Sequence, residues 1–567
     1  MYVKIITSGT RRYVRLVEAF RDEQGASQHR VIANLGRLES VQAGEANALI
    51  NGLLRASGQA SLEEGSGSVE FAPALTVGDT WLLTALWKSL GFHDAFRRAL
   101  RTAHPSFDAE KLLRVMVFNR LCDPESKLGL LRWLEATLVP EVETESVTHQ
   151  RLLRVMDTVA ERAQSLETTL ATLLRPLIDE TLSLVFYDMT TISVEAGEVD
   201  EDDLRRFGMS KEGVIRPQVM LGVVQTAEGL PLHHEVFAGN TAEAKTLIPV
   251  LRQVLARFPI RRVIVVADRG LLSLDNLEEL KGITLADGVP LEFILAVPGR
   301  RYGDFTETLA TFHTSTCLKA EQEVVGETTW NGCRLIMAHH PWVAATKTSA
   351  RDARIDEIEA LAADWAGKLD GQDAGVKAKG RKLSDAGAGA RFYHAVKEAH
   401  LGRILRLDMH ATTFSYHLDE AALALARIND GKLILVTNVD AATLTATQVV
   451  ERYKSLADIE RGFRVLKSEI EIAPVFHRLT QRIRAHALIC FLALVLYRVM
   501  RMRLKAKHSP LSPERALEIT RRIQWHQVTL HQRHTTSGLS ALTPQQQELF
   551  SILDLPIPSQ NRLQPAS

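Results

Sequence analysis

Hydrophobic positions along this chain change their spacing several times, and each change predicts a different kind of element. Residues 1–40 alternate apolar and polar side chains in short runs such as YVKII and YVRLVEAF, with turn-forming residues between them. Alternation with a period of two is typical of strands that bury one face. The pattern therefore predicts a small N-terminal β-hairpin or meander. Residues 56–68, ASGQASLEEGSGS, have the composition of a linker.

From residue 74 to 180 the apolar side chains recur at helical spacing, as in TWLLTALWKSLGF and EKLLRVMVFNRL. This spacing predicts a helical domain. Several basic residues lie along these helices: Arg114, Arg120, Lys127, Arg132, Arg151 and Arg154. Such charges usually form a solvated face, and the alternative is a DNA-binding surface.

Continuous apolar runs replace the helical pattern between residues 181 and 300. The runs TLSLVFYDMTTI, RRVIVVADRG and LEFILAVPGR predict buried strands, and QVMLGVVQT with LPLHHEVFAG predicts an antiparallel pair. EAKTLIPVLRQVLARF predicts an amphipathic helix. The order of three strands, a helix, a strand, a short helix and a strand indicates a layered α/β arrangement.

Residues 301–430 are less regular and interrupt this arrangement as an insertion. They contain strand-like runs, CRLIMAH and RFYHAV, and a charged helix, SARDARIDEIEALAADWAGKL. The chain then returns to a strand, GKLILVTNV, followed by a long helix from about Thr445 to Glu471. The apolar run ALICFLALVLY is shorter than the roughly 20 residues that a membrane span needs, so it predicts a buried helix.

Composition and charge narrow the class of protein. With 567 residues, 46% hydrophobic and 24% charged, the chain is an ordinary globular protein of about two to four domains. Its 68 basic and 68 acidic residues balance, so a nucleic-acid partner would need a local basic surface. Residues 452–507 provide one, because basic residues clearly outnumber acidic ones there.

The four cysteines, Cys122, Cys317, Cys333 and Cys490, form no CxxC pair, which indicates a reducing compartment. A zinc site built from Cys317 and Cys333 with the histidines near them would match no standard ligand spacing. Buried thiols and surface histidines are the preferred interpretation. The histidines concerned are His313, His339 and His340.

Two of the predicted strands lead into an acid. Asp188 follows LVFY, and Asp268 follows VIVVA. Acids at strand ends of a layered sheet converge at one edge, where ligands bind. An aspartate in such a position can also be a turn former or a helix cap.

The long helix near residue 460 supplies a third acid. At about 100° per residue, Tyr453, Glu460 and Lys467 fall within roughly 60° of arc. A neighbouring stripe can bury in the core, so Glu460 and Lys467 would point along the edge of the domain. The alternative is a surface charge pair, and Arg464 on the same side favours a site. The stripe comprises Ile459, Phe463, Leu466 and Ile470.

Three carboxylates are suited to two divalent cations. Mg²⁺ prefers oxygen ligands, and two metals activate the attacking oxygen and stabilise the leaving oxygen of a phosphodiester. Arg464 and Lys467 would then neutralise phosphate charge, and Tyr453 would donate a hydrogen bond to phosphate.

The helix resembles a known family at this point. Tyr453, Glu460 and Lys467 match the spacing Y-(2)-R-(3)-E-(6)-K, the signature of one group of DDE transposases of bacterial insertion sequences. Leu456 stands at the signature's arginine position, and Arg461 or Arg464 can substitute for it. YDMTT and VADRG resemble the first two acidic motifs of this group. GNTAEAKTL, RLCDPESKL and the N-terminal segment ending in NLGRLE extend the resemblance to nearly the whole chain.

The resemblance implies a multidomain α/β protein with an RNase H-like mixed-sheet catalytic core. A β-rich insertion would interrupt this core, and an N-terminal β-hairpin and a helical domain would precede it. The 192 residues between Asp268 and Glu460 leave room for the insertion. The expected division begins with an N-terminal β-hairpin region (1–55), a linker (56–70) and a helical domain that binds DNA (71–180). The first part of the core (181–300), the insertion (301–430) and the second part of the core with the Glu helix (431–510) follow. A C-terminal tail (511–567) ends the division.

The function expected from these observations is metal-dependent strand cleavage and strand transfer of an insertion sequence. Asp188, Asp268 and Glu460 would bind two Mg²⁺ or Mn²⁺ ions, and Tyr453, Arg461, Arg464 and Lys467 would bind DNA phosphates. The partners would be double-stranded DNA, comprising the terminal inverted repeats and the target, and a second copy of the chain in a homodimer assembled on DNA. We expect a cytoplasmic, nucleoid-associated protein that does not bind membranes. The alternatives are an RNase H-like nuclease or resolvase without strand transfer, an inactive DNA-binding relic, and a phosphatase of the haloacid dehalogenase type with Asp188 as nucleophile.

Overall fold

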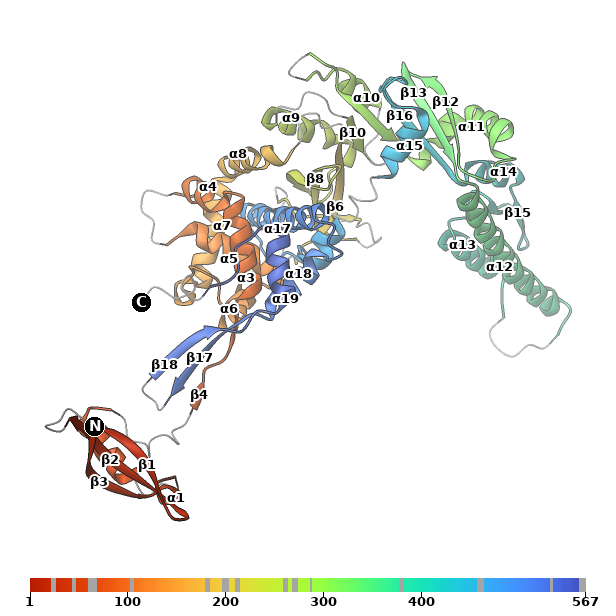
Figure 1. Ribbon diagram of the computed structural model, residues 1–567. Coiled ribbons are helices and arrows are strands. Elements are labelled where there is room, and N and C mark those ends of the chain that lie inside the picture. The colour runs from red at the N-terminus through yellow and green to blue at the C-terminus, as the bar shows by residue number, and fades with distance from the viewer. Residues whose placement is uncertain are drawn as a thin grey trace.

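The computed structural model describes residues 1–21, 27–42, 47–59, 69–101, 107–178, 184–195, 203–209, 215–258, 264–267, 274–285, 288–376, 382–455, 463–530 and 534–559. It confirms a mixed α/β protein with an antiparallel sheet at the N-terminus, which stands apart from the other sheets in Figure 1. The elements of this N-terminal part are β1 (Tyr2–Ser8), β2 (Arg11–Arg21), β3 (Ser27–Arg37), α1 (Leu38–Gln42) and α2 (Asn47–Ala56).

A helical region follows, and helices from the C-terminal part of the chain pack into it. Its own helices are α3 (Gly78–Ser89), α4 (Phe92–Ala99), α5 (Ala109–Cys122), α6 (Lys127–Glu135), α7 (His149–Glu161) and α8 (Ala163–Leu174). Joined to them are α17 (Thr480–Ala506), α18 (Pro513–Arg521) and α19 (Pro544–Ile552). Helix α17 packs against α5 and α7, and α18 packs against α3. One continuous hydrophobic core therefore joins residues from both parts of the sequence.

Strands from both parts of the chain also meet beside this helical region. β17 (Gln524–Leu530) pairs with β18 (His534–Leu539) on one side. On its other side it pairs with β4 (Val69–Phe71) and β5 (Leu75–Thr76). The region before the helices and the region after them thus form one small sheet.

Two expectations for the helical region have different outcomes. Helix α17 is long and apolar enough to cross a membrane by composition alone, but 94% of its most apolar window is buried inside the protein. The prediction of a buried core helix is confirmed. The prediction of a solvated basic face is wrong for Arg114, Arg120 and Lys127, which are 0%, 5% and 6% exposed. These three side chains are enclosed because α5 and α6 lie between other helices of the same core.

The central sheet has the order β12-β13-β16-β11-β10-β6-β8-β7, and β9 also pairs with β8. β6, β8 and β9 form an antiparallel meander, and β10 and β11 run parallel to β6. The sheet is therefore mixed, as expected. The strands are β6 (Leu184–Ser193), β7 (Arg206–Met209), β8 (Ile215–Thr226), β9 (Pro231–Ala238), β10 (Ile264–Ala267), β11 (Glu292–Ala296), β12 (Val324–Trp330), β13 (Cys333–His339) and β16 (Lys432–Thr437).

The two faces of this sheet bury different sets of side chains. Phe186 and Val266 belong to the core shared with α15 (Ala446–Lys454), the π-helical turn η8 (Val465–Glu469) and α17. The next residues, Tyr187 and Ala267, belong to a second core. That core is covered by α9 (Leu247–Arg257), α10 (Leu274–Lys281) and α11 (Thr306–Phe312).

The insertion differs from the expected β-rich domain. β12 and β13 form a hairpin that extends the central sheet beyond β16. Most of the described residues between 341 and 429 are helical, in α12 (Pro341–Asp373), α13 (Asp385–Glu398) and α14 (Glu420–Asn429). The strands in this described part are β14 (Leu405–Leu407) and β15 (Tyr416–Leu418). The charged helix is confirmed as α12. RFYHAV lies in α13 and is not a strand, because Phe392 and Val396 pack on the same side of the helix into a third core.

Candidate active site

Asp188 lies on β6 directly after three buried residues, Val185 to Tyr187. The prediction that the strand ends at this acid is wrong. β6 continues to Ser193 in antiparallel pairing with β8. Asp188 is half-buried, and its Oδ1 accepts a hydrogen bond of 2.6 Å from the backbone N–H of Met189. The strand therefore fixes the position of this carboxylate.

The alternation of β6 determines which face of the sheet Asp188 occupies. Successive side chains of a strand point to opposite faces. Phe186 and Ile192, at even spacing from Asp188, belong to the core shared with α15 and η8. Asp188 is consequently on the face of the sheet that packs against α15 and η8.

Asp268 and Glu460 lie outside the described residues, as do Leu456 and Arg461. The last described residue of β10 is Ala267, which pairs in parallel register with Tyr187. The residues immediately preceding the two predicted aspartates are thus neighbours on adjacent strands. Within the described ranges, no group of three or more His, Cys, Asp or Glu side chains is placed to hold a metal ion.

The helix predicted around residue 460 is described on both sides of that residue. α15 begins after Thr445, whose side chain forms a capping box with Gln448, so the predicted start is confirmed. Its Val449 and Val450 are buried. The later part is a π-helical turn at Val465–Glu469. A constant 100° per residue does not describe such a turn, and Glu460 lies outside the described residues, so the angle between Glu460 and Lys467 stays a prediction.

The basic and aromatic residues of the signature differ in exposure. Tyr453 is half-buried and packs against the main core. Arg464 is exposed, and Lys467 is half-buried within the π-helical turn. Lys454, next to Tyr453, forms an ion pair of 2.6 Å with Glu323 just before β12. Arg464 therefore has the most open access to a ligand from solvent among these described side chains.

Three of the residues considered for zinc, His313, His339 and Cys317, lie around Lys432. Lys432 Nζ lies 3.2 Å from His313 Nδ1 and 3.0 Å from His339 Nδ1. Burial, then the charge of Lys432, lowers the pKa of His339 to about 4. Burial likewise raises the pKa of the Cys317 thiol. An ammonium group among neutral ligands disfavours a cation, and the preference for buried thiols is confirmed. The expectation of a surface histidine is wrong for His339, which is 5% exposed.

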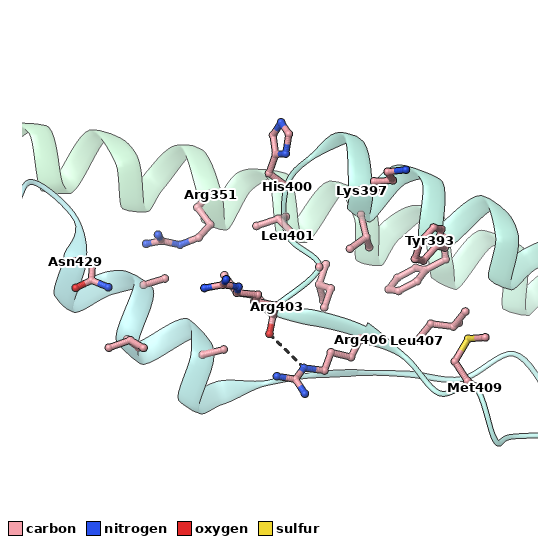
Figure 2. A pocket seen from close by; sticks show the side chains of 18 residues that line it. Arg351, Tyr393, Lys397, His400, Leu401, Arg403, Arg406, Leu407, Met409 and Asn429 are labelled. Carbon is pink, nitrogen blue, oxygen red and sulfur yellow. Dashed lines mark hydrogen bonds between the residues drawn. The ribbon is translucent and has the colours of Figure 1, made fainter. Parts of the chain in front are cut away.

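The insertion contains an open cavity of about 880 Å³ between α12, α13, β14 and α14 (Figure 2). Arg351 and Arg403 point into it, and Tyr393 and Met409 line it with large exposed surfaces. Arg351 is held by an ion pair with Asp430. The lining includes no carboxylate. This cavity therefore suits an anion and cannot be the predicted metal site.

Sequence reasoning missed a second cluster of cationic side chains. Arg120, Lys127 and His486 line a cavity where the helical region meets residues 471–479. Arg120 and Lys127 lie in RLCDPESKL and were predicted to form part of a solvated face or a DNA-binding surface, and not to line a buried cavity. The sequence signal that could have revealed this cluster is the short distance along the chain between Arg120 and Lys127, with Pro124 between them.

Comparisons with known proteins agree with the geometry. Residues 3–65 match the model of the IS1634 family transposase, N-terminal domain, and residues 302–496 match the model of the Transposase DDE domain. No sequence among curated proteins matches this chain. The chain is also similar to the cryo-EM structure of the piggyBac transposase synaptic complex with hairpin DNA. That likeness has 8% identity and a TM-score of 0.40, and covers 78% of this chain and 79% of the other.

Proposed function

We propose that this chain, a DDE-type DNA transposase with an IS1634-family N-terminal domain, cuts and joins DNA with Asp188, Asp268 and Glu460 as its catalytic carboxylates. Strand cleavage at the ends of an insertion sequence and transfer of those ends to a target are the two reactions. The observation that carries the proposal is the parallel pairing of Tyr187 with Ala267. It makes the residues next in the chain, both aspartates, candidates for one site.

The faces of the sheet support the same grouping. Ile264 and Val266 bury their side chains in the core that also contains Phe186. Continued alternation along β10 would direct residue 268 to that face, which is the face of Asp188.

The course of the chain around Glu460 supports its inclusion. Before this residue, α15 packs against β12 and β13, at one end of the sheet. After it, η8 packs against α17, which covers β9 at the other end. β10 and β6 lie between these two ends in the strand order. These contacts support the proposal that the segment with Glu460 lies over the strands that lead into Asp188 and Asp268.

A DDE transposase domain implies the use of divalent metal ions. We propose two ions, Mg²⁺ or Mn²⁺, because carboxylate oxygens of the predicted type are their preferred ligands. The half-buried Asp188, oriented by the Met189 N–H, fits such a role. When bound, the ions would activate the attacking oxygen and neutralise the leaving oxygen. The side chains proposed to bind DNA phosphates near this site are Tyr453, Arg461, Arg464 and Lys467.

The partners follow from the same proposal. The protein would bind double-stranded DNA at the terminal inverted repeats of its element and at the target, and would act as a homodimer assembled on that DNA. Residues 71–180 would contribute contacts to DNA. Its place would be the bacterial cytoplasm, at the nucleoid.

Metal-dependent cleavage of a duplex that carries the element's terminal repeat tests the proposal. Cleavage is expected with Mg²⁺ or Mn²⁺, and none with Ca²⁺ or a chelator, because Ca²⁺ accepts looser geometry. Asp188→Asn should lower the cleavage rate at least about a hundredfold while DNA binding persists. Glu195→Gln, an exposed acid just beyond β6, is the matched control and should cleave normally. An Asp188→Asn variant that cuts at nearly the wild-type rate contradicts the assignment. Cleavage without joining to target DNA would favour the nuclease alternative.

A further inference from the structure

A cavity of about 860 Å³ lies between the helical region and the segment that links η8 to α17. Its walls come from α5, α6, α7, α17 and residues 471–479. Binding sites for small organic groups commonly have volumes of about 300–1,000 Å³, so a phosphate with its sugar can enter. This cavity is separate from the basic cavity of the insertion in Figure 2.

Buried basic side chains line the cavity with few partners. Arg120, Lys127 and His486 are only 5%, 6% and 6% exposed. Lys127 makes no hydrogen bond or ion pair with any residue that the structure describes. Arg120 Nε and His486 Nδ1 are buried without a hydrogen-bond partner among those residues. His486 Nε2 donates to Ile472 O at 3.0 Å, so Nδ1 of this neutral ring is an acceptor and the unpaired cationic groups are Arg120 Nε and the Lys127 ammonium. Unpaired buried donors are costly, so the presence of these two together indicates a missing anionic partner.

The acids of the cavity do not neutralise this charge. Arg482, which lines the cavity, is paired with Asp157 through contacts of 2.7 and 2.8 Å. Glu125 lies nearest to Arg132, at 3.9 Å, and Glu471 is exposed.

The shifted pKa values of the cavity reflect the excess of positive charge. Burial and then the charge of Arg120 lower the pKa of Lys127 to about 7. Burial, followed by the charges of Lys127, Arg482, His149 and Arg120, lowers the pKa of His477 to about 4. Burial and the charges of Lys127 and Arg120 likewise depress the pKa of His486. Positive charge therefore dominates around the buried end of the cavity, although Glu125 and Glu471 also line it.

Three helices begin at this cavity. Lys127 is the first residue of α6, His149 is the first residue of α7, and Thr480 is the first residue of α17. Each helix N-terminus carries a partial positive charge and unpaired N–H groups that favour anions. The helix dipoles and the buried basic side chains thus both favour an anion in the cavity.

The cavity is connected to β6, the strand of Asp188. Val475 forms a bridge with Val194, the residue that follows β6. Hydrogen bonds join Val475 N–H to Ser193 O at 3.1 Å and Glu195 N–H to Val475 O at 2.9 Å. A strand rises about 3.3 Å per residue, so this bridge lies roughly 20 Å from Asp188 along the strand.

We propose that this cavity binds a backbone phosphate of the transposase's DNA, several nucleotides from the bond that is cut. The assignment of the ligand to DNA rests on the proposed function, whereas the capacity to bind phosphate does not. Lys127 would be the central contact, with Arg120 and His149 beside it. A phosphate held there would connect the helical region and the catalytic segment to the same DNA molecule.

The first experiment measures binding of inorganic phosphate to the full chain without metal. Titration at constant ionic strength and a pH of about 6, where Lys127 carries its charge, should show saturable thermal stabilisation. Lys127→Met should weaken the phosphate affinity at least about tenfold, and His149→Gln should weaken it less. Lys505→Met, exposed at the opposite end of α17, should leave it unchanged. Equal phosphate affinity in wild type and Lys127→Met overturns the proposal.

The second experiment distinguishes DNA from free phosphate as the source. In the presence of chelator, Lys127→Met should weaken binding of a terminal-repeat duplex and lower the slope of log affinity against log salt by about 0.9. A variant that loses phosphate binding but keeps the wild-type DNA slope overturns the assignment to DNA. Neither measurement requires cleavage. Both therefore test the phosphate site even if Asp188 proves not to be catalytic.

Discussion

Burial gives two charged residues of this protein very different settings. Asp188 is half-buried, and a backbone N–H from Met189 orients its carboxylate. Lys127 is 6% exposed and makes no ion pair within the described part of the chain. Enclosing such an ammonium group opposes folding, because a charge in a poorly solvated place is stabilised only by a partner. A residue that costs stability and has no structural partner is a candidate for binding.

Replacement of Lys127 by methionine is expected to raise the thermal stability of the ligand-free protein near neutral pH. Burial lowers the pKa of Lys127 from its ordinary value of 10.5 to about 7. Between these values the unfolded chain binds a proton that the folded chain does not, so stability from this group rises with pH. Lys127→Met should melt a few degrees higher at a pH of about 7, and the difference should shrink toward a pH of about 10.

Melting curves of wild type, Lys127→Met and Lys505→Met over this pH range make the comparison. Lys505 is exposed, so its variant should follow the wild type. A lower melting temperature for Lys127→Met throughout the range would mean that the lysine stabilises the fold.

At the scale of elements, local patterns predicted most of the central sheet. The apolar runs that predict strands correspond to β6, β8, β9, β10, β11 and β16, and the helix predicted to start at about Thr445 begins directly after that residue. RFYHAV was predicted as a strand because aromatic and β-branched residues favour strands. In the structure Phe392 and Val396 lie one helical turn apart and pack against α12. Tertiary packing therefore determined that RFYHAV is helical, against its local strand preference.

The two lysines near the ends of the Glu460 segment provide a paired prediction. Lys467→Ala should lower the slope of log DNA affinity against log salt by about 0.9, because one phosphate contact would be lost. Lys454→Ala should leave the slope unchanged, since Lys454 pairs with Glu323. Its effect on stability should be about 0–1 kcal/mol, as for other exposed ion pairs.

Filter-binding assays at several salt concentrations, together with melting temperatures, separate the two roles. An unchanged slope and a large loss of stability in Lys467→Ala would make that lysine structural.

At the scale of the whole molecule, α17 connects parts that are far apart in the sequence. Its buried residues belong to the core that contains the helices α3 to α8 and one face of the central sheet. Sequence patterns identified α17 as a buried helix but gave no indication of its neighbours. The same is true of the cationic cavity, because the burial of Arg120 and Lys127 depends on how α5, α6, α7 and α17 meet.

Truncation within α17 should destabilise the molecule as a whole. Leu494 is completely buried, so Leu494→Ala should cost about 2–5 kcal/mol through lost contacts and a cavity. Leu128→Ala removes the same atoms from a side chain that is 59% exposed, and should change stability by about 0.5 kcal/mol or less. Denaturant unfolding monitored by circular dichroism compares the two. Similar losses in both variants would contradict the role of α17 as the shared core helix.

The central claim is that three acids far apart in the sequence surround one pair of metal ions. Fe²⁺ bound in place of Mg²⁺ reacts with added hydrogen peroxide to give Fe³⁺, hydroxide and a hydroxyl radical. The radical cuts the polypeptide beside the ion, so the positions of the cuts report which segments lie there. The account predicts cuts near Asp188, Asp268 and Glu460 in the same sample of DNA-bound protein. All three cuts should be lost in Asp188→Asn and retained in Glu451→Gln, which changes an exposed acid of α15. The absence of cuts at one of the three segments, or the persistence of cuts in Asp188→Asn, would contradict the claim that these acids surround the same metal ions.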